Sequence, residues 1–496
     1  MNKKELYRGV GVLWLIFLTI GTTTSCTVGP DFEQPELESV MQEQWNTVEK
    51  GQHFSEFDQP FIRWWEQFND DELTRLIEQV FSSSLALKQA RQRVVEVSAR
   101  QGVVTAERRM QLSAALGYTR VETGDEAVSL QGIPAGKTVD VFSTGVVAGW
   151  ELDLWGRIAR LTEAAEEDIR VGYADYQGLL VSLAAETALS YIELRTVEDR
   201  IEMVKDNIDL QIASLDLATT RFEAGIGNEL AVVRIERLVE SSRARLPELA
   251  RELSMTRNHI KVLLGQPPAT ENPGPGEIPE VPALIGIGLP TDLLTRRPDI
   301  RRALSVYHAA VARIGAVEAE QYPTLSLSGY LTLSSDTIGG VFDSDAIIYS
   351  LGPGLKFPIL TGSRIRSTIA VRESQAEQAR LAMEQCIIEA LSEVENSAEG
   401  VVRSQQQAER LFRAEKLAKK SVKLADELYQ AGVADFSQVL DSKQQLLENQ
   451  EVLLLAKQQA LSQVIRLYRA LGGGWEQAPL AMVETEDNIE KQGSTH

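Results

Sequence analysis

The chain has 496 residues, a hydrophobic content of 43% and a formal net charge of −21. The hydrophobic content excludes wholesale disorder, and the length is enough for several domains. The negative charge argues against a nucleic-acid-binding protein, because no block rich in lysine or arginine relieves it, and it fits a periplasmic or surface protein.

The first residues look like a bacterial export signal. Basic residues precede the apolar stretch 10–20, which is too short to span a bilayer comfortably, and small residues follow it. Cys26 comes next and resembles a lipoprotein cleavage site, although Thr23 stands where such signals usually carry leucine. We therefore expect residues 1–25 to be a signal peptide and Cys26 to be a lipid anchor. Plain signal cleavage and an unmodified thiol are the alternatives. Thr27, in place of an aspartate, fits sorting to the outer membrane.

The segment 26–60 is polar and has no sustained period, which predicts an extended arm. A helical region then runs from the acidic residues at 70–72 to about Arg109, with a break near Ser82–Ser84.

No later segment is long and apolar enough for a transmembrane helix, so an integral membrane role would have to come from strands. Cys386 lies in a predicted helix and is most simply a small packed hydrophobe.

The hydrophobic period changes to two in both halves of the chain. Apolar residues alternate with small or polar ones in two runs between about 111 and 155, and in two more between about 324 and 358. Each run has about the 9 to 11 residues that a membrane-spanning strand needs. The pattern predicts two β-hairpins with long loops. The clearest alternating positions are Leu112, Ala114, Leu116, Tyr118, Leu325, Leu327, Leu331 and Leu333.

A long helical hairpin is predicted after each strand hairpin, at 158–264 and at 363–471. Between Arg364 and Tyr429 there is no proline and one glycine, and apolar residues recur at alternating spacings of four and three. This pattern predicts a coiled-coil seam about 100 Å long. In the second return helix two adjacent heptad positions are apolar, which favours a wall of helices with a neighbour on each side.

The same order of elements occurs twice, which indicates an internal duplication with a separation of about 207 residues. We expect a first repeat at 61–265 and a second at 291–475. A proline-rich linker at 266–290 joins them, and a polar tail follows at 476–496.

Physical limits then point to oligomerisation. Four strands expose two edges and cannot close a barrel, because lipid tolerates no open edge and the smallest membrane barrels need about eight strands. A helical hairpin of this length also cannot bury its seams on its own chain's small domains. The expected product is an oligomeric tube.

Four motifs lie in order along nearly the whole chain: CTVGPDF at 26–32, WELDLWGR at 150–157, RRPDIR at 296–301 and ALGGGW at 470–475. With these motifs the chain resembles the TolC-type outer-membrane efflux factors, and especially their OprM-like lipoprotein branch. The resemblance implies an α+β membrane protein, lipid-anchored in the bacterial outer membrane and with a large periplasmic portion. It implies a trimer whose 12-stranded β-barrel, with four strands per chain, continues into a long periplasmic α-helical barrel.

The function implied by this resemblance is that of the passive exit duct of a tripartite efflux pump, which conducts drugs or other small solutes to the exterior. The implied partners are the other chains of a homotrimer, a periplasmic adaptor protein, an inner-membrane RND-type transporter and outer-membrane lipid, with no nucleic acid and no cofactor. The adaptor would dock on two helix-turn tips, at Gly225 and Gly227 and at Gly432 and Val433. The glycines there also simply let the chain reverse.

A periplasmic gate can be carried over from the family at one position. Acidic residues just after the second tip narrow the tunnel in the family, and Asp441 matches the inner such position. A ring of like carboxylates would select against anions, while a solvated aspartate at a helix start is the alternative. Gln438 and Ala231 depart from the family's acidic pattern, so Arg234 and Asp435 are further gate candidates.

The sequence contains no recognisable catalytic or metal-binding constellation, and we expect no enzyme. The four histidines show no metal-ligand spacing, and the paired carboxylates lie in charge-rich helical contexts. The alternative from another class is a periplasmic coiled-coil scaffold or adaptor, against which the nearly uncharged strand faces argue. Within the channel class, a type I protein-secretion duct is the second alternative, and only analogy favours solute efflux over it.

Overall fold

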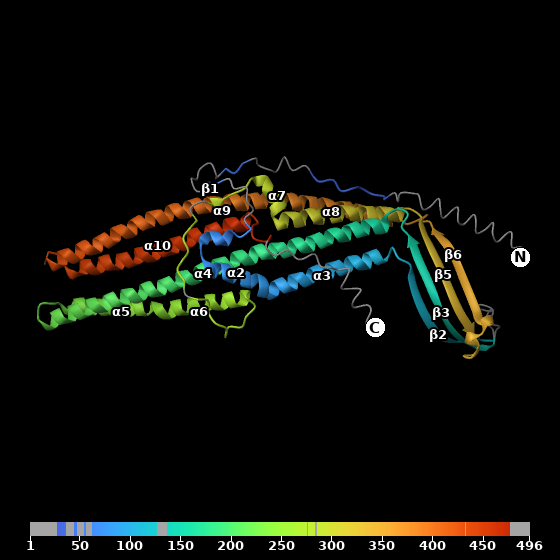
Figure 1. Cartoon of the computed structure of the whole chain (residues 1–496), viewed down its shortest axis with the longest axis horizontal. Helices are drawn as coiled ribbons and strands as arrows, with labels where there is room; N and C mark the ends of the chain where they lie inside the picture. Colours follow the sequence, from blue (N-terminus) through green and yellow to red (C-terminus); the bar gives the residue numbers. More distant parts are fainter. Residues whose placement is uncertain are drawn as a thin grey trace. The chain divides into compact units, whose positions relative to one another are not determined.

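The structure is a computed structural model that describes residues 27–35, 44–46, 54–55, 62–125, 136–274, 276–282, 285–431 and 433–476. It divides into two compact units, each assembled from segments far apart in the sequence (Figure 1). The units cut across the two predicted repeats, because each contains segments from both. Unit 1 is Met1–Pro35, Val95–Val171 and Ala303–Met383, and unit 2 is Glu36–Val94, Gly172–Arg302 and Glu384–His496.

Unit 1 contains a four-stranded antiparallel sheet with the strand order β2–β3–β5–β6 (Figure 1). Each repeat supplies one hairpin, and the hairpins join where β3 pairs with β5, in a register that sets Trp150 opposite Leu327. This pairing leaves β2 and β6 as the two edges of the sheet. The bounds are β2 (Gln111–Glu122), β3 (Thr138–Leu152), β5 (Thr324–Ser335) and β6 (Ile347–Lys356).

The edge strands of this sheet present large apolar side chains to the exterior of the chain. Leu116 of β2 is 87% exposed, and Tyr349 and Leu351 of β6 are 79% and 75% exposed. All of β2 except Val121 is exposed, and successive residues of a strand point to opposite faces. Neither face of β2 is therefore covered by the described part of the chain.

Residues 27–35 belong to unit 1 and pack beside the end of β3. The Val28 N–H donates to the Trp155 carbonyl at 3.1 Å, and the buried Arg160 donates to the carboxylate of Asp31 at 2.6 Å. Gly29 has a positive φ of 97°, and a Cβ there would lie 2.3 Å from the Cα of Gly315. The two backbones can approach this closely only because Gly29 and Gly315 both lack a side chain.

Two helices of 67 residues each follow the strand hairpins, and each is about 100 Å long. The sequence predicts one return helix after each of them. The first return helix is interrupted at Ala244, because Pro247 has no N–H to donate to the carbonyl of Arg243. The long helices are α4 (Arg157–Glu223) and α9 (Arg364–Gln430), and the return helices are α5 (Glu229–Arg243), α6 (Arg245–Leu263) and α10 (Phe436–Ala470).

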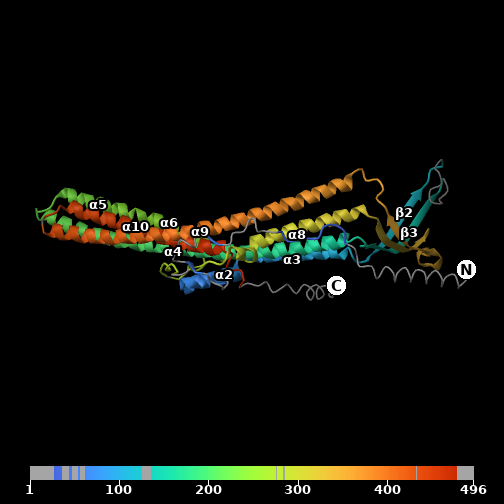
Figure 2. The same cartoon turned by 90° about the horizontal axis from the view of Figure 1, so that it is seen from above.

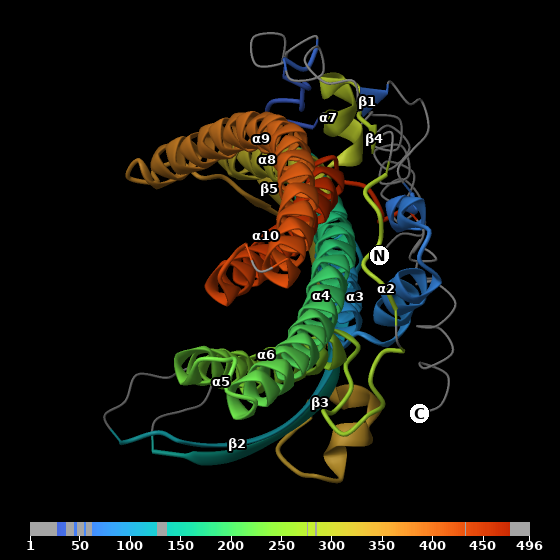
Figure 3. The ribbon, with the colours of Figure 1, turned by 90° about the vertical axis from the view of Figure 1, so that its left-hand side faces the viewer.

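In unit 2 these helices lie side by side along one curved layer (Figures 2 and 3). Arg200 of α4 pairs with Glu252 of α6 at 3.1 Å and with Glu451 of α10 at 3.3 Å. Val204 of α4 packs against Leu249 of α6. Helix α4 therefore has a neighbour on each side, as expected for a wall of helices.

Shorter elements complete the described part of the chain. The α2 and α3 helices meet at Ser84, within the predicted break. The parallel strands β1 and β4 lie in segments that the sequence predicts to be extended arm and linker, and they pair with each other. No helix among the described residues has the length and apolar character to cross a membrane. The bounds are β1 (Phe54–Ser55), α2 (Asp71–Ser83), α3 (Leu85–Ala106), β4 (Ile285–Gly286), α7 (Leu293–Arg296) and α8 (Pro298–Glu318).

Candidate functional site

The first helix tip is a tight, glycine-capped turn between α4 and α5. Gly225 has a φ of 74°, its N–H bonds the Phe222 carbonyl at 2.9 Å, and the Ile226 N–H bonds the Arg221 carbonyl at 3.0 Å. This is a Schellman cap, whose left-handed position favours glycine. At Gly227 a Cβ would lie 2.6 Å from the Phe222 nitrogen, so the turn has no room for a side chain there.

The second tip, between α9 and α10, repeats this geometry where it is described. The Val433 N–H bonds the Leu428 carbonyl at 2.9 Å, which is the bond equivalent to that from Ile226. Val433 is 76% exposed and Ile226 is 72% exposed, so each tip presents one bare apolar side chain. Of the predicted tip and anchor residues, Gly432 and Cys26 lie outside the described residues.

A contact between α4 and α9 ties the two helical hairpins together near the tips. Arg221 donates a hydrogen bond to the hydroxyl of Tyr429, and its guanidinium carbon lies 4.9 Å from the centroid of the same ring. The Tyr429 ring also packs on Phe436 of α10, with 5.0 Å between ring centroids. Sequence reasoning misses this link, because its members come from different repeats.

The predicted gate residues are all exposed. Asp435 is the N-cap of α10, and its carboxylate accepts a hydrogen bond from the Ser437 N–H at 3.1 Å. Asp441 lies on α10 and Arg234 on α5, and within the described part of the chain neither forms an ion pair or a side-chain hydrogen bond. The structure therefore gives Asp435 a capping role and leaves Asp441 and Arg234 as solvated charges of one chain.

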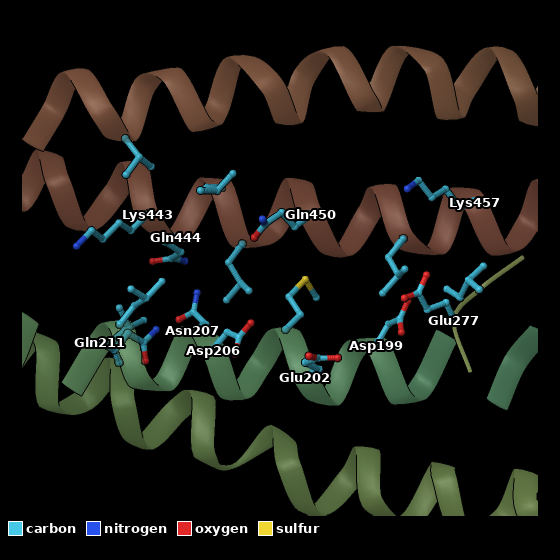
Figure 4. Close-up of a pocket in the computed structure, with 18 of the residues that line it drawn as sticks. Asp199, Glu202, Asp206, Asn207, Gln211, Glu277, Lys443, Gln444, Gln450 and Lys457 are labelled. Atoms are coloured by element: carbon cyan, nitrogen blue, oxygen red, sulfur yellow. The ribbon is translucent and has the colours of Figure 1, made fainter. Parts of the chain in front are cut away.

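A groove of about 1150 Å³ runs between α4 and α10 (Figure 4). Acidic residues of α4 face polar and basic residues of α10 across it, with Asp206 and Glu202 on one wall and Gln444 and Gln450 on the other. Its apolar lining includes the leucines of α10 at intervals of seven. Those leucines are Leu440, Leu447, Leu454 and Leu461.

The charged form of one groove carboxylate, Asp199, is disfavoured by its surroundings. Burial raises the pKa of Asp199, and the negative charge of Glu202 and Glu277 raises it further, while Lys457 opposes the change. Lys443 donates to the hydroxyl of Ser214 at 3.2 Å across the groove. The sequence offers a signal for one wall, since Lys443, Gln450 and Lys457 are seven residues apart, but it does not say which helix faces them.

Reactive groups are few among the described residues. Burial raises the pKa of the Cys386 thiol to about 11, so this cysteine is protonated at neutral pH and is a poor nucleophile. His308 lies between two carboxylates, with Nδ1 2.9 Å from Glu167 and Nε2 3.0 Å from Glu163, and Phe32 stacks on its ring. No group of three or more His, Cys, Asp or Glu residues in the described ranges could hold a metal ion.

Comparison with known proteins decides the family. Residues 76–266 and 289–473 match the family model described as outer membrane efflux protein. The chain belongs to this family. The two matched ranges correspond to the two halves of the chain, and the family is the TolC-type family that the sequence motifs resemble.

Relatives of this outer membrane efflux protein match over nearly their full length. The solvent efflux pump outer membrane protein SrpC of Pseudomonas putida is 29% identical over 91% of this chain and 96% of its own. The outer membrane protein OprJ of Pseudomonas aeruginosa is 28% identical over 95% of this chain and 96% of its own. The solved outer-membrane channel OprN has a TM-score of 0.83 and 29% identity, covering 91% of this chain and 100% of that structure.

The efflux protein is therefore an outer-membrane exit duct of an efflux system. Family membership over both halves decides against the periplasmic scaffold. The predicted recognition and the predicted channel function are confirmed. Family members are channels, which fits a protein that is not an enzyme.

Proposed function

We propose that three copies of this chain form one channel, with a 12-stranded β-barrel in the outer membrane and a periplasmic helical tunnel. The observation that carries the proposal is the uncovered sheet, whose edge strands β2 and β6 expose apolar side chains. Unpaired strand edges are not tolerated in lipid. Pairing β2 of one copy with β6 of the next satisfies both edges, and three copies close the ring.

The strand lengths support this arrangement. The four strands have 12, 15, 12 and 10 residues. A tilted strand needs about 9 to 11 residues to cross the hydrocarbon core of a membrane. Each strand is therefore long enough to span, and β3 extends beyond the core.

The lipid anchor fits the same placement. Thr27 follows the proposed anchor Cys26 directly and lies against Gly156, four residues after β3 ends, where a Cβ would be 2.7 Å from the Thr27 methyl group. A lipid chain on Cys26 would thus enter the bilayer close to the end of a membrane strand. Plain signal cleavage at this site is the alternative that mass spectrometry of the mature N-terminus would detect.

The rest of the pump would meet the duct at the helix tips. In this proposal a periplasmic adaptor contacts the exposed Ile226 and Val433 beside the tip glycines and links the duct to an inner-membrane RND-type transporter. Drugs or other small solutes are the cargo, in keeping with a relative named as a solvent efflux pump component. Asp441 forms the periplasmic gate, with Arg234 and Asp435 as further candidates, because three copies would bring three like carboxylates together.

Single-channel conductance of the purified protein in planar bilayers tests the proposal, together with its molar mass in detergent. We expect a trimer with discrete, mostly closed channels whose open probability rises in Asp441→Ala. Glu409→Ala, which removes an exposed carboxylate of α9 paired with Arg413, serves as the matched control. Channels unaffected by Asp441→Ala would keep the duct and remove this gate, whereas a folded protein that is monomeric or never conducts would overturn the trimeric barrel.

A further inference from the structure

Two buried oxygen atoms in the groove between α4 and α10 have no hydrogen-bond donor among the residues that the structure describes. Gln211 is 8% exposed, and its side-chain oxygen has no partner in the described part of the chain. The same holds for the side-chain oxygen of Asn207, one turn earlier on α4. Both residues line the groove (Figure 4). Because unsatisfied buried acceptors are rare and costly, these two call for a donor from outside the chain.

Negative charge continues from these acceptors along the same wall. Asp199, Glu202 and Asp206 are spaced by three and four residues, so they share one face of α4 and extend over about 10 Å of its axis. Among the described residues, six carboxylates and two lysines line the groove. One of these lysines, Lys443, is engaged with Ser214. The groove thus attracts a cation that also carries N–H donors.

The shape of the groove favours an extended organic cation over a metal ion. Its volume is about 1150 Å³, far more than one ion fills. No group of three metal-ligating residues is present in the described ranges. The facing wall on α10 is apolar at Leu447 and Leu454, and Met203 adds an apolar contact from α4. Such a wall suits the methylene chain of a ligand.

We propose that this groove binds a linear aliphatic polyamine. Its ammonium groups pair with the row of carboxylates from Asp199 to Asp206, and its N–H groups donate to the oxygens of Asn207 and Gln211. The methylene segments lie on Leu447 and Leu454. Charge-assisted hydrogen bonds of this kind are the strong ones in proteins. The site is additional to the exit-duct function, and binding requires neither the pump partners nor an open channel.

Calorimetric titration of the purified protein in detergent with spermidine tests the site. We expect saturable binding that Asp206→Asn weakens about tenfold, which corresponds to the loss of one charge-assisted contact. Gln211→Leu keeps the side-chain volume, removes the orphan acceptor and is expected to weaken binding without lowering Tm. Glu240→Gln, which removes an exposed α5 carboxylate paired with Arg243 at 2.7 Å, is the matched control and should bind like wild type.

Two further results separate this site from general charge attraction. Mg²⁺ at matched ionic strength is expected not to displace spermidine, because it offers no N–H donor and no methylene chain. Displacement by Mg²⁺, or equal weakening by Glu240→Gln and Asp206→Asn, would overturn the proposal. So would the absence of saturable binding to the folded wild-type protein, or unchanged affinity in both groove variants.

Discussion

The link between Arg221 and Tyr429 is expected to hold the two helical hairpins together at their periplasmic end. It combines a hydrogen bond from a charged donor with a guanidinium group 4.9 Å from the ring centroid. Such a hydrogen bond contributes about 1.5–3 kcal/mol, and a partly exposed cation–π contact about 0.5–1 kcal/mol. Tyr429→Phe removes only the hydrogen bond, whereas Tyr429→Leu removes both contributions.

If the hairpins part when the duct opens, these losses shift the closed-to-open equilibrium. We expect Tyr429→Phe to raise the open probability in planar bilayers at least about tenfold, since about 1.4 kcal/mol corresponds to a factor of ten. Tyr429→Leu should raise it further. The control is Tyr173→Phe, on α4 about 70 Å from Arg221. An open probability unchanged in both Tyr429 variants, with the oligomer intact, would refute this role for the link.

Two other expectations concern stability and the arm. Hydrogen bonds from Arg75 at 2.8 Å and from the Gly274 N–H at 3.1 Å lower the pKa of Glu72, although burial acts in the opposite direction. The ionised Glu72 carboxylate therefore stabilises the fold at pH values above its unfolded pKa of 4.5. This stabilisation is lost as the pH falls through the folded pKa. Glu72→Gln should therefore lower Tm at pH 7, and this deficit should shrink towards pH 3; a deficit independent of pH would contradict the assignment. Gly29→Ala should release residues 27–35, because its Cβ would lie 2.3 Å from the Cα of Gly315, and amide hydrogen exchange should become faster in this segment. Gly102→Ala is the control: its Cβ would have no atom within 4 Å, so hydrogen exchange should stay unchanged.

The long helices could be read from the sequence because their apolar spacing persists over many turns. Helix α9 begins at Arg364, where the pattern places its start, and spans 67 residues. The interruption at Ala244 was not predicted, although Pro247 cannot donate a backbone hydrogen bond inside a helix. The spacing of apolar side chains does not show this break, because a proline removes a backbone N–H without interrupting the apolar pattern.

The sheet shows a different limit. Alternation identifies each strand and its faces, but it does not say which strand pairs with which, so the contact of β3 with β5 has no signal in the pattern. The strands β1 and β4 have two residues each, too few for any period to be visible. These pairings are set by contacts between distant parts of the chain.

The groove and the tip link were missed for a related reason. Each wall of the groove has a regular spacing in its own helix, as with Asp199 and Asp206 or Lys443 and Lys457. These two rows of residues form one groove only because α4 faces α10, and this arrangement is decided by packing between the repeats. The tip glycines, by contrast, could be located directly, because a left-handed cap such as that at Gly225 favours one residue type.

The backbone hydrogen bonds between β3 and β5 determine which substitutions the junction of the two halves tolerates. It joins the two halves through backbone groups, which every residue except proline supplies alike. Substitutions on either strand can therefore accumulate without breaking the junction, as long as each face keeps its chemical character. The two halves can therefore vary independently at this junction, whereas side-chain links between them, such as that of Arg221 with Tyr429, have to be kept as pairs.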